Sequence, residues 1–327
     1  MREAAGSRAG GLPSTNMELP REVLDRPVFA AGDQDYRWAD VVAAARQWSR
    51  WGELERRAAD GVGALARLTE KIGQAELLDE MQEFRYARNL LAAEEMEAWL
   101  DHWGLTAKSW SFYLHRKIAR SRGLGESGPP PDERDVWAEA VCSGALADLA
   151  RDLAARVAAA EAGGAEPGPV ESDLARMDEE HAAFVRDALS AEAAAKALEL
   201  RNADWVRLSY TQLEFPAAAM ASEAALLVRE DGLSPADVAG RAGVPLQERE
   251  TFLEEVEPEL REPLLSAPAG ELVGPLSVPN GFALVCVTEK VAPSLTDPVI
   301  QERLQEEVPR RALEREVRNR VQWHEHL

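Results

Sequence analysis

The two histidines close to the carboxyl end of the chain are spaced as a possible pair of metal ligands. His324 and His326 form a His-x-His sequence, and imidazole nitrogens are common ligands of zinc. A structural zinc site needs four ligands, and no third ligand is apparent near this pair. We therefore expect a solvated tail here and no metal site.

The other residue types that carry out chemistry occur singly. His102, His115 and His181 are isolated in helical patterns, and the acidic runs lack a partner pattern for acid–base work. Cys142 and Cys286 lie in apolar segments, which favours structural thiols over a redox pair. The sequence has no Gly-rich phosphate loop, no nucleophile elbow and no Cys-x-x-Cys. It therefore predicts no cofactor, and it gives no support to a nucleotide-binding or serine-hydrolase site.

The composition is that of a globular protein with a strong negative charge. Of 327 residues, 46% are hydrophobic and 29% are charged, and the formal net charge is -21. A chain of this length has room for two packed cores. The negative charge argues against a nucleic-acid partner, because a phosphate backbone needs a basic face. The charge does not choose between basic, neutral and acidic peptide partners.

The sequence predicts neither a membrane span nor a secretory signal. No segment approaches the roughly 20 apolar residues that a bilayer span requires. Residues 1–17 are polar and Gly-rich, without the apolar stretch of a signal peptide. We therefore expect a cytoplasmic protein that does not bind a membrane.

Helical periodicity dominates the amino-terminal half. Residues 1–20 contain several Gly and Pro and few large hydrophobes, which predicts a flexible tail. From Trp38 to about residue 200, apolar residues recur at every third and fourth position, so we expect this half to be all-α. Thr106 is placed to cap a helix. One long Ala-rich helix is expected over 136–162, and one helix or a pair of helices over 171–200.

The pattern changes after residue 204. Residues 205–213 alternate between apolar and polar side chains, as in a half-buried strand. Two helices follow, and the second starts at Ser234 with a proline in its first position. Asn280–Gly281 lies between two apolar runs and predicts a hairpin turn. Between about 204 and 292 we expect the order β-α-α-(α)-β-β.

Two segments complete the expected elements. After the helix that ends at Gly243 we expect a loop to Glu248 and then a short apolar patch at Phe252 and Leu253. A helix that starts at Pro298 closes the chain, and Pro309 inside it should kink or interrupt it.

This order of elements resembles the SurA/PpiC class of parvulin-type peptidyl-prolyl isomerases and chaperones. Residues 270–287, Gly-Glu-Leu-Val-Gly-Pro-Leu-Ser-Val-Pro-Asn-Gly-Phe-Ala-Leu-Val-Cys-Val, are similar to the end of a parvulin domain. Residues 227–243 look like the helices of the same domain, and residues 80–120 are similar to the amino-terminal chaperone region.

The resemblance implies an α+β protein with a helical chaperone-like domain and a degenerate parvulin-like β-α-α-β-β domain. The implied boundaries are a flexible tail over 1–20, the helical domain over 21–203, and the parvulin-like domain over 204–292. Residues 293–327 would form a C-terminal helix that returns to pack on the helical domain.

The chain departs from this family at the positions that carry the isomerase chemistry. Family members usually have a histidine where this sequence has Tyr210, and a second histidine where it has Ala283. The family's catalytic Cys or Asp loop and its Gly-Gly-x-Leu-Gly segment have no clear counterpart between 243 and 257. An isomerase must lower a barrier of about 18–20 kcal/mol, and a site for that is not assembled in recognisable form. We therefore expect no catalytic residue, and the alternative is an active isomerase with an unorthodox site.

Four side chains are candidates for a peptide-binding groove in the parvulin-like domain: Tyr210, Gln212, Phe252 and Phe282. Aromatic rings supply a large contact area at low entropic cost, and a peptide can bind in an apolar groove or by strand addition. For Phe252 and Phe282 an ordinary core position is the alternative. The same choice applies to the tryptophans of the amino-terminal helices, which either pack between helices or line an apolar peptide cradle.

The sequence thus predicts a non-catalytic peptide-binding protein, a chaperone or escort that holds an extended precursor peptide. The resemblance extends to proteins of peptide-maturation systems that accompany ribosomally made, modified peptides, which implies their modifying enzymes as further partners. An active parvulin-type isomerase and a general holdase chaperone are the alternatives.

Overall fold

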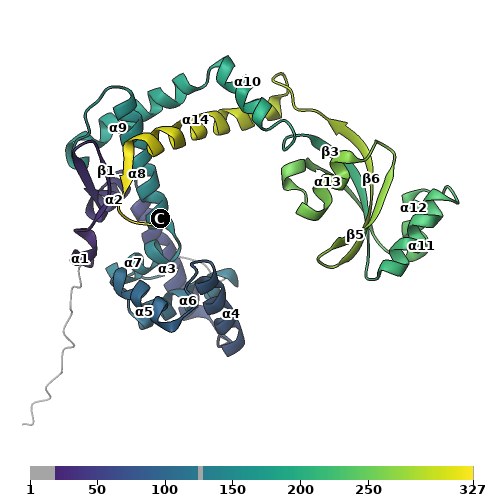
Figure 1. Cartoon of the computed structure of the whole chain (residues 1–327). Coiled ribbons are helices and arrows are strands. Elements are labelled where there is room, and N and C mark those ends of the chain that lie inside the picture. Colours follow the sequence, from purple (N-terminus) through teal and green to yellow (C-terminus); the bar gives the residue numbers. More distant parts are fainter. Residues whose placement is uncertain (1–18, 124–127, 327) are drawn as a thin grey trace, which may run out of the picture. The chain divides into compact units, whose positions relative to one another are not determined.

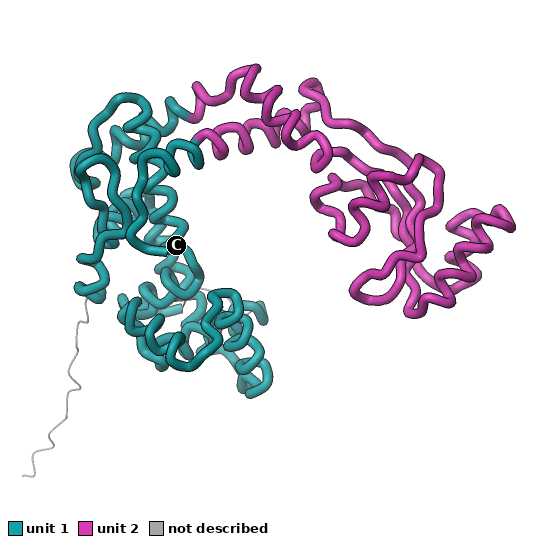
Figure 2. The backbone as a smooth tube through the Cα atoms, viewed as in Figure 1, with its two compact units in different colours: residues 1–184, 313–327 teal, residues 185–312 magenta. Residues whose placement is uncertain are grey.

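The computed structural model describes residues 19–123 and 128–326, so most of the predicted tail over 1–20 lies outside the described residues. The chain divides into two compact units (Figure 2). Unit 1 contains residues 1–184 and 313–327, and unit 2 contains residues 185–312. None of the helices in the described ranges combines the length and the apolarity that a bilayer span requires. The domain boundaries inferred from the sequence, at 203/204 and 292/293, stay predictions.

Unit 1 is built mainly of helices (Figure 1). They are α1 (Arg21–Leu24), α2 (Trp38–Gln47), α3 (Arg50–Arg67), α4 (Gln74–Tyr86), α5 (Ala93–His102), α6 (Ala107–Ser121), α7 (Glu133–Cys142), α8 (Ala145–Ala162), most of α9 (Val170–Ala188) and the end of α14 (Pro298–Arg320). Thr106 caps α6 as predicted, with its Oγ1 accepting a hydrogen bond from the Ser109 amide at 3.1 Å. The single helix expected over 136–162 is two helices, because Gly144 has φ +86° and ends the continuity between α7 and α8.

A three-stranded antiparallel sheet is also part of unit 1, but its strands lie outside the stretch from Trp38 to about residue 200, where the described elements are all helices as predicted. Its strands are β1 (Pro27–Ala31), β2 (Gln34–Arg37) and β7 (Val321–Trp323), in the order β2-β1-β7. Phe29 of β1 stacks on Tyr36 with ring centroids 4.8 Å apart and meets Trp323 of β7 at 5.4 Å. The strands are too short to show a clear period-two pattern, and β7 comes from the far end of the chain.

A buried carboxylate ties three helices of unit 1 together. Glu139 of α7 is fully buried, and both of its oxygens accept hydrogen bonds from Arg120 of α6 at 3.0 Å. Arg57 of α3 lies 3.2 Å from the same carboxylate. A buried charge is tolerated only when it is paired in this way, so the network specifies how α3, α6 and α7 pack.

Unit 2 is a four-stranded antiparallel sheet with helices on both faces. Its elements are α10 (Ala191–Leu200), β3 (Arg207–Phe215), α11 (Ala218–Arg229), α12 (Pro235–Ala242), β4 (Leu246–Phe252), the 3-10 turn Leu253–Glu255, α13 (Pro258–Ser266), β5 (Leu272–Val278), β6 (Gly281–Val291) and the first part of α14. The strand order is β4-β3-β6-β5. The α+β architecture predicted from the sequence is therefore confirmed, with β4 as a strand where the sequence analysis expected a loop to Glu248 and then a short apolar patch.

The alternation of β3 divides its side chains between two cores. Leu208 and Tyr210 belong to one core, which α13 covers with Leu260. Leu213 and Phe215 belong to the other core, which α11 and α12 cover (Figure 1). Each face of the sheet is thus closed by its own helices, as a two-sided antiparallel sheet requires.

The predicted hairpin turn joins β5 and β6. Gly281 has φ +140°, and a Cβ there would lie 2.3 Å from the carbonyl oxygen of Phe215. Only glycine fits such a close backbone approach, which explains why the turn carries the Asn280–Gly281 pair.

The last helix, α14, runs through Pro309 without interruption. In unit 2 its apolar side packs with α10 and the base of the sheet through Trp205, Phe252, Ile300 and Leu304. Its final residues belong to unit 1, where the following strand β7 pairs with β1.

Candidate functional site

A polar hollow of about 420 Å³ lies beside strands β3 and β4 of unit 2. It is lined by Tyr210, Gln212, Glu248, Arg249, Glu250, Thr251, Glu255, Val256, Glu257 and Leu260. Its size falls in the range of small-ligand sites. The lining is mainly polar, which differs from the apolar groove that the sequence analysis expects.

Two of the predicted site residues, Tyr210 and Gln212, lie side by side in this hollow because they are two positions apart on β3. Both residues are nearly buried, with 4% and 2% of their surface exposed. Gln212 donates a hydrogen bond from Nε2 to Glu214 Oε1 at 2.8 Å. The phenolic oxygen of Tyr210 has no hydrogen-bond partner among the described residues. The oxygen is not among the buried side-chain atoms that lack a partner, so it is accessible in the hollow, where water or a ligand can bond to it.

The electrostatic surroundings of Tyr210 keep its phenol protonated. Burial raises the pKa of Tyr210, the guanidinium of Arg249 opposes this shift, and the carboxylate of Glu257 adds to it. Arg249 donates to Gln247 Oε1 at 2.5 Å and forms no ion pair among the described residues. The hydroxyl can therefore donate a hydrogen bond, for example to a peptide carbonyl.

One acidic residue of the hollow is fixed by the last helix. Glu255 accepts a hydrogen bond from Thr251 Oγ1 at 2.6 Å and forms an ion pair with Arg303 of α14. The hydrogen bond from Thr251 lowers the pKa of Glu255, burial opposes this, and Arg303 lowers it further. Contacts to Thr251 and Arg303 thus fix the position of Glu255 in the lining of the hollow. The exposed strand β4 also contributes to this lining.

The other two predicted site residues lie elsewhere. Phe252 packs among α10 and α14 with the Arg303 guanidinium 3.7 Å from its ring centroid. Phe282 is half-buried against the core under α11 and α12. The structure therefore brings Tyr210 and Gln212 together and places Phe252 and Phe282 in two separate clusters. A peptide contact by any of the four stays a prediction.

The SurA/PpiC class usually has its second histidine at the position of Ala283, and this position is inaccessible in the present chain. Ala283 is fully buried, opposite Glu214 of β3. The five histidines of the sequence are His102, His115, His181, His324 and His326, so residues 185–312 contain none. Cys286 contributes to the core on the other face of the sheet, and burial raises the pKa of its thiol. The hollow therefore has neither an imidazole nor a thiolate for acid–base or nucleophilic chemistry.

Sequence reasoning missed the residues that β4 contributes to the hollow. Glu248, Arg249 and Glu250 are three consecutive charged residues on an exposed edge strand, where the usual apolar alternation is absent. Gln247, Arg249 and Thr251 pair with the Tyr210 side of β3, but they are as polar as the residues between them, so the sequence gives no clear signal for this strand.

The remaining candidates of the sequence analysis lie in unit 1. His324 Nε2 lies 3.6 Å from Asp35 Oδ1, and His102 Nε2 lies 3.0 Å from Glu325 Oε2. Within residues 19–123 and 128–326, no group of three or more His, Cys, Asp or Glu side chains is arranged to hold a metal ion. The amino-terminal tryptophans are buried or half-buried in the helical core: Trp38, Trp48, Trp51, Trp99, Trp103 and Trp110.

Comparison with known proteins gives structural matches alone. No protein-family model and no curated protein sequence matches the chain. The structure resembles PrsA and SurA-like chaperones. It matches PrsA from Bacillus anthracis, described as a peptidylprolyl isomerase, over 79% of this chain and 94% of that chain, with 11% identity and a TM-score of 0.28. It matches PrsA from Bacillus subtilis over 90% of both chains, with 12% identity and a TM-score of 0.23.

A third match is a structure from Campylobacter jejuni, described under the names PEB4 and Cj1289 as SurA-like chaperones. It covers 92% of this chain and 100% of that chain, with 10% identity and a TM-score of 0.22. At this level of similarity these matches carry no argument on activity, substrate or location.

Proposed function

We propose that this chain is a non-catalytic peptide-binding chaperone that holds an extended peptide along β4, with Tyr210 and Gln212 as hydrogen-bonding contacts. The observation that carries this proposal is the hollow itself. The hydroxyl of Tyr210 is accessible there and has no hydrogen-bond partner among the described residues, and the hollow lies beside an edge strand. A peptide backbone presents alternating N–H and C=O groups, which is the chemistry that both features can satisfy.

Strand addition at β4 is the binding mode that fits this geometry. β4 is the outer strand of the order β4-β3-β6-β5, so one row of its backbone groups faces no strand of this sheet. Four consecutive residues of β4, Glu248–Thr251, line the hollow. A peptide that extends the sheet would therefore place alternate side chains at the hollow's mouth.

The polar lining of the hollow does not favour prolyl isomerisation. A catalyst must hold a twisted amide among apolar contacts and suitable hydrogen bonds, because the uncatalysed barrier is about 18–20 kcal/mol. This hollow carries four glutamates and one arginine, and its apolar contacts come from Tyr210, Val256 and Leu260. Ala283 is buried and offers no group to a ligand.

For the client we propose an extended precursor peptide of a ribosomally made, modified peptide, held in the cytoplasm for its modifying enzymes. This part of the proposal rests on the family analogy drawn from the sequence and on a hollow whose lining holds neither an imidazole nor a thiol. A general holdase would bind unfolded chains broadly and weakly, whereas an escort prefers one sequence.

The test is an NMR titration of isotope-labelled, proline-containing peptides with the full chain, combined with exchange spectroscopy. The peptides include the precursor encoded nearest to the gene and a scrambled version of it. We expect selective line broadening of the precursor without faster cis–trans exchange. Equal broadening of both peptides would support a general holdase, and accelerated exchange at catalytic protein concentrations would show an isomerase. The absence of any broadening would refute the proposal.

A further inference from the structure

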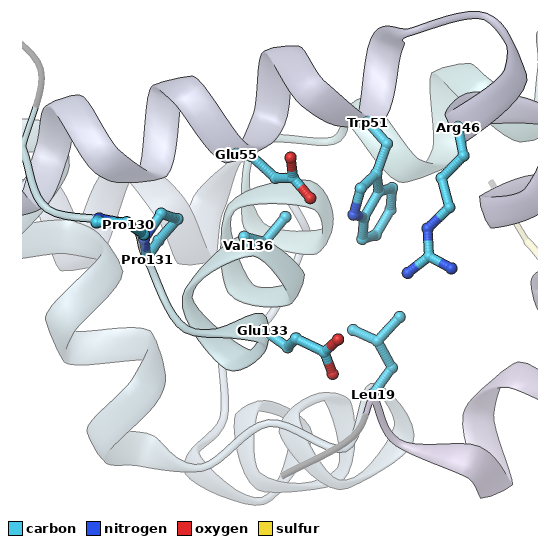
Figure 3. A pocket seen from close by; sticks show the side chains of 8 residues that line it. All are labelled: Leu19, Arg46, Trp51, Glu55, Pro130, Pro131, Glu133 and Val136. Carbon is cyan, nitrogen blue, oxygen red and sulfur yellow. The ribbon is translucent and has the colours of Figure 1, made fainter. Parts of the chain in front are cut away.

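Unit 1 contains a second pocket, of about 280 Å³, between α3 and the start of α7 (Figure 3). It is lined by Leu19, Arg46, Trp51, Glu55, Pro130, Pro131, Glu133 and Val136. The walls combine apolar side chains with three charged ones. Its volume lies just below the usual range for drug-sized ligands, so it suits a single large side chain better than a cofactor.

Trp51 forms the centre of this pocket. Its residue surface is 4% exposed, yet the indole N–H has no hydrogen-bond acceptor among the described residues. Figure 3 shows the indole nitrogen on the side of the ring that faces Glu55. This N–H is not among the buried side-chain atoms that lack a partner, so it is accessible in the pocket and can donate to an acceptor that a ligand supplies.

The charged side chains of the pocket have no ion-pair partner among the described residues. Glu55 and Glu133 have no ion-pair partner in residues 19–123 and 128–326, and Figure 3 shows both carboxylates turned toward the same space. Arg46 forms no ion pair there either, and its guanidinium carbon lies 5.8 Å from the Trp51 ring centroid. Two carboxylates against one guanidinium leave the pocket with an excess of one negative charge.

We propose that this pocket binds the side chain of a lysine or arginine residue carried by an extended peptide. The methylene stem would contact Leu19, Pro131 and Val136, as the apolar stems of such side chains do. The cationic end would meet the two carboxylates, and the ring of Trp51 would add a cation–π contact. The peptide carbonyl next to the bound residue would accept the indole N–H.

Arg46 acts as an internal competitor in this arrangement. It presents a cation of the same kind at the mouth of the pocket, within reach of the Trp51 ring. An anionic ligand would instead have to use Arg46 alone, and it would be repelled by Glu55 and Glu133. The charge balance therefore favours a basic side chain over an acidic one.

This inference depends on the proposed function for the origin of the basic residue, a client peptide. The pocket itself can be tested with small probes that do not engage the hollow at Tyr210. A failure of one proposal is therefore distinguishable from a failure of the other.

The experiment uses the full chain labelled with 5-fluorotryptophan, with the Trp51 signal assigned from Trp51→Phe. Four amides are titrated at constant ionic strength: the Nα-acetyl N-methylamides of lysine, arginine, norleucine and glutamate. We expect a saturable shift of the Trp51 ¹⁹F signal for lysine and arginine, with a dissociation constant of about 1 mM, and no shift for the other two. The effect should weaken with added salt.

Three variants sharpen the test. Replacing both acids, Glu55→Gln with Glu133→Gln, should weaken lysine binding about tenfold or more, because charge-assisted hydrogen bonds are lost. Arg46→Gln should tighten it, because the competitor is gone. Glu97→Gln, which removes an exposed acid of α5, is the matched control and should leave binding unchanged. Equal shifts with the glutamate probe, no shift with lysine, or full binding by the double variant would overturn the proposal.

Discussion

At the scale of single residues, the hollow in unit 2 is lined by two polar residues that are largely buried. Tyr210 and Gln212 are nearly inaccessible, and the Tyr210 hydroxyl has no partner within the described residues. The hydroxyl is not among the buried atoms that lack a partner, so it is accessible in the hollow and can donate a hydrogen bond to a ligand.

Tyr210→Phe tests this role of the hydroxyl directly. We expect it to weaken binding of the precursor peptide by about 2- to 10-fold, because one neutral hydrogen bond contributes about 0.5–1.5 kcal/mol. The free energy of unfolding should stay the same or rise slightly, because no internal hydrogen bond is removed. Peptide titration and urea denaturation of the same samples measure the two effects.

Tyr113→Phe is the matched control for that variant. Tyr113 is also 4% exposed, lies in the core of unit 1 and has no hydrogen bond among the described residues. It should leave peptide binding unchanged. Equal losses of binding in both variants, or none in Tyr210→Phe, would contradict the role of the Tyr210 hydroxyl.

At the scale of elements, α14 is held to α10 by one acidic residue. Glu307 of α14 accepts a hydrogen bond from Arg201 of α10 at 3.2 Å and one from Arg311 at 2.5 Å, and it also pairs with Arg310. Arg201 binds Asp204 at 2.9 Å as well, just before β3. Arg303 of the same helix forms an ion pair with Glu255, which lines the hollow, so the packing of α14 in unit 2 also positions Glu255.

The stability that Glu307 contributes should depend on pH. Burial by itself raises the pKa of Glu307, but the hydrogen bonds from Arg310, Arg311 and Arg201 outweigh it, so the folded-state pKa lies below the usual value. The contribution is therefore fully present above the unfolded-state pKa of about 4.3 and is lost as the pH falls through the folded-state pKa. Glu307→Gln should be less stable than wild type by about 1–3 kcal/mol at neutral pH, and the difference should shrink below about pH 4.

Urea denaturation of both proteins across this pH range measures the difference in unfolding free energy. Glu314→Gln, also on α14, is a poor control because Glu314 has contacts of its own. Glu302→Gln is the better one, since Glu302 is an exposed acid on the same helix. A difference that is constant with pH would mean that the carboxylate charge does not stabilise α14.

At the scale of the whole molecule, the chain contains two units with separate cores. Leu153 of α8 is fully buried in the core of unit 1, and Leu208 of β3 is fully buried in unit 2. Units with their own hydrophobic cores can unfold as separate cooperative steps.

We therefore expect that Leu153→Ala and Leu208→Ala each lower the stability of one unit only. Removing a buried leucine side chain costs about 2–5 kcal/mol. Calorimetry should show two transitions, with a different one shifted in each variant, and hydrogen exchange should place each loss of protection in the mutated unit. A single transition shifted equally by both substitutions would show that the chain unfolds as one unit.

The sequence by itself determined the features that depend on neighbouring residues. Thr106, Ser234 and the Asn280–Gly281 turn act through backbone groups a few residues away, so their helix starts and hairpin are as predicted. The alternation over 205–213 predicts β3, which spans Arg207–Phe215, and it places Tyr210 and Gln212 on one face. The α+β class follows from these local patterns.

Only the tertiary structure determines the features that depend on pairing between distant segments, which are the positions of Phe252 and Phe282 and the strands β4 and β7. Phe282 pairs with Phe215 and Phe252 pairs with Arg207, and both partners lie on the opposite face of β3 from Tyr210, so the two rings are absent from the hollow. The strand β7 forms only because β1 offers it an edge, and the charged strand β4 forms only because β3 supplies its hydrogen bonds. Outside a hairpin, strand pairing also depends on contacts between residues far apart in the chain, and the local sequence pattern does not specify which distant strands will pair.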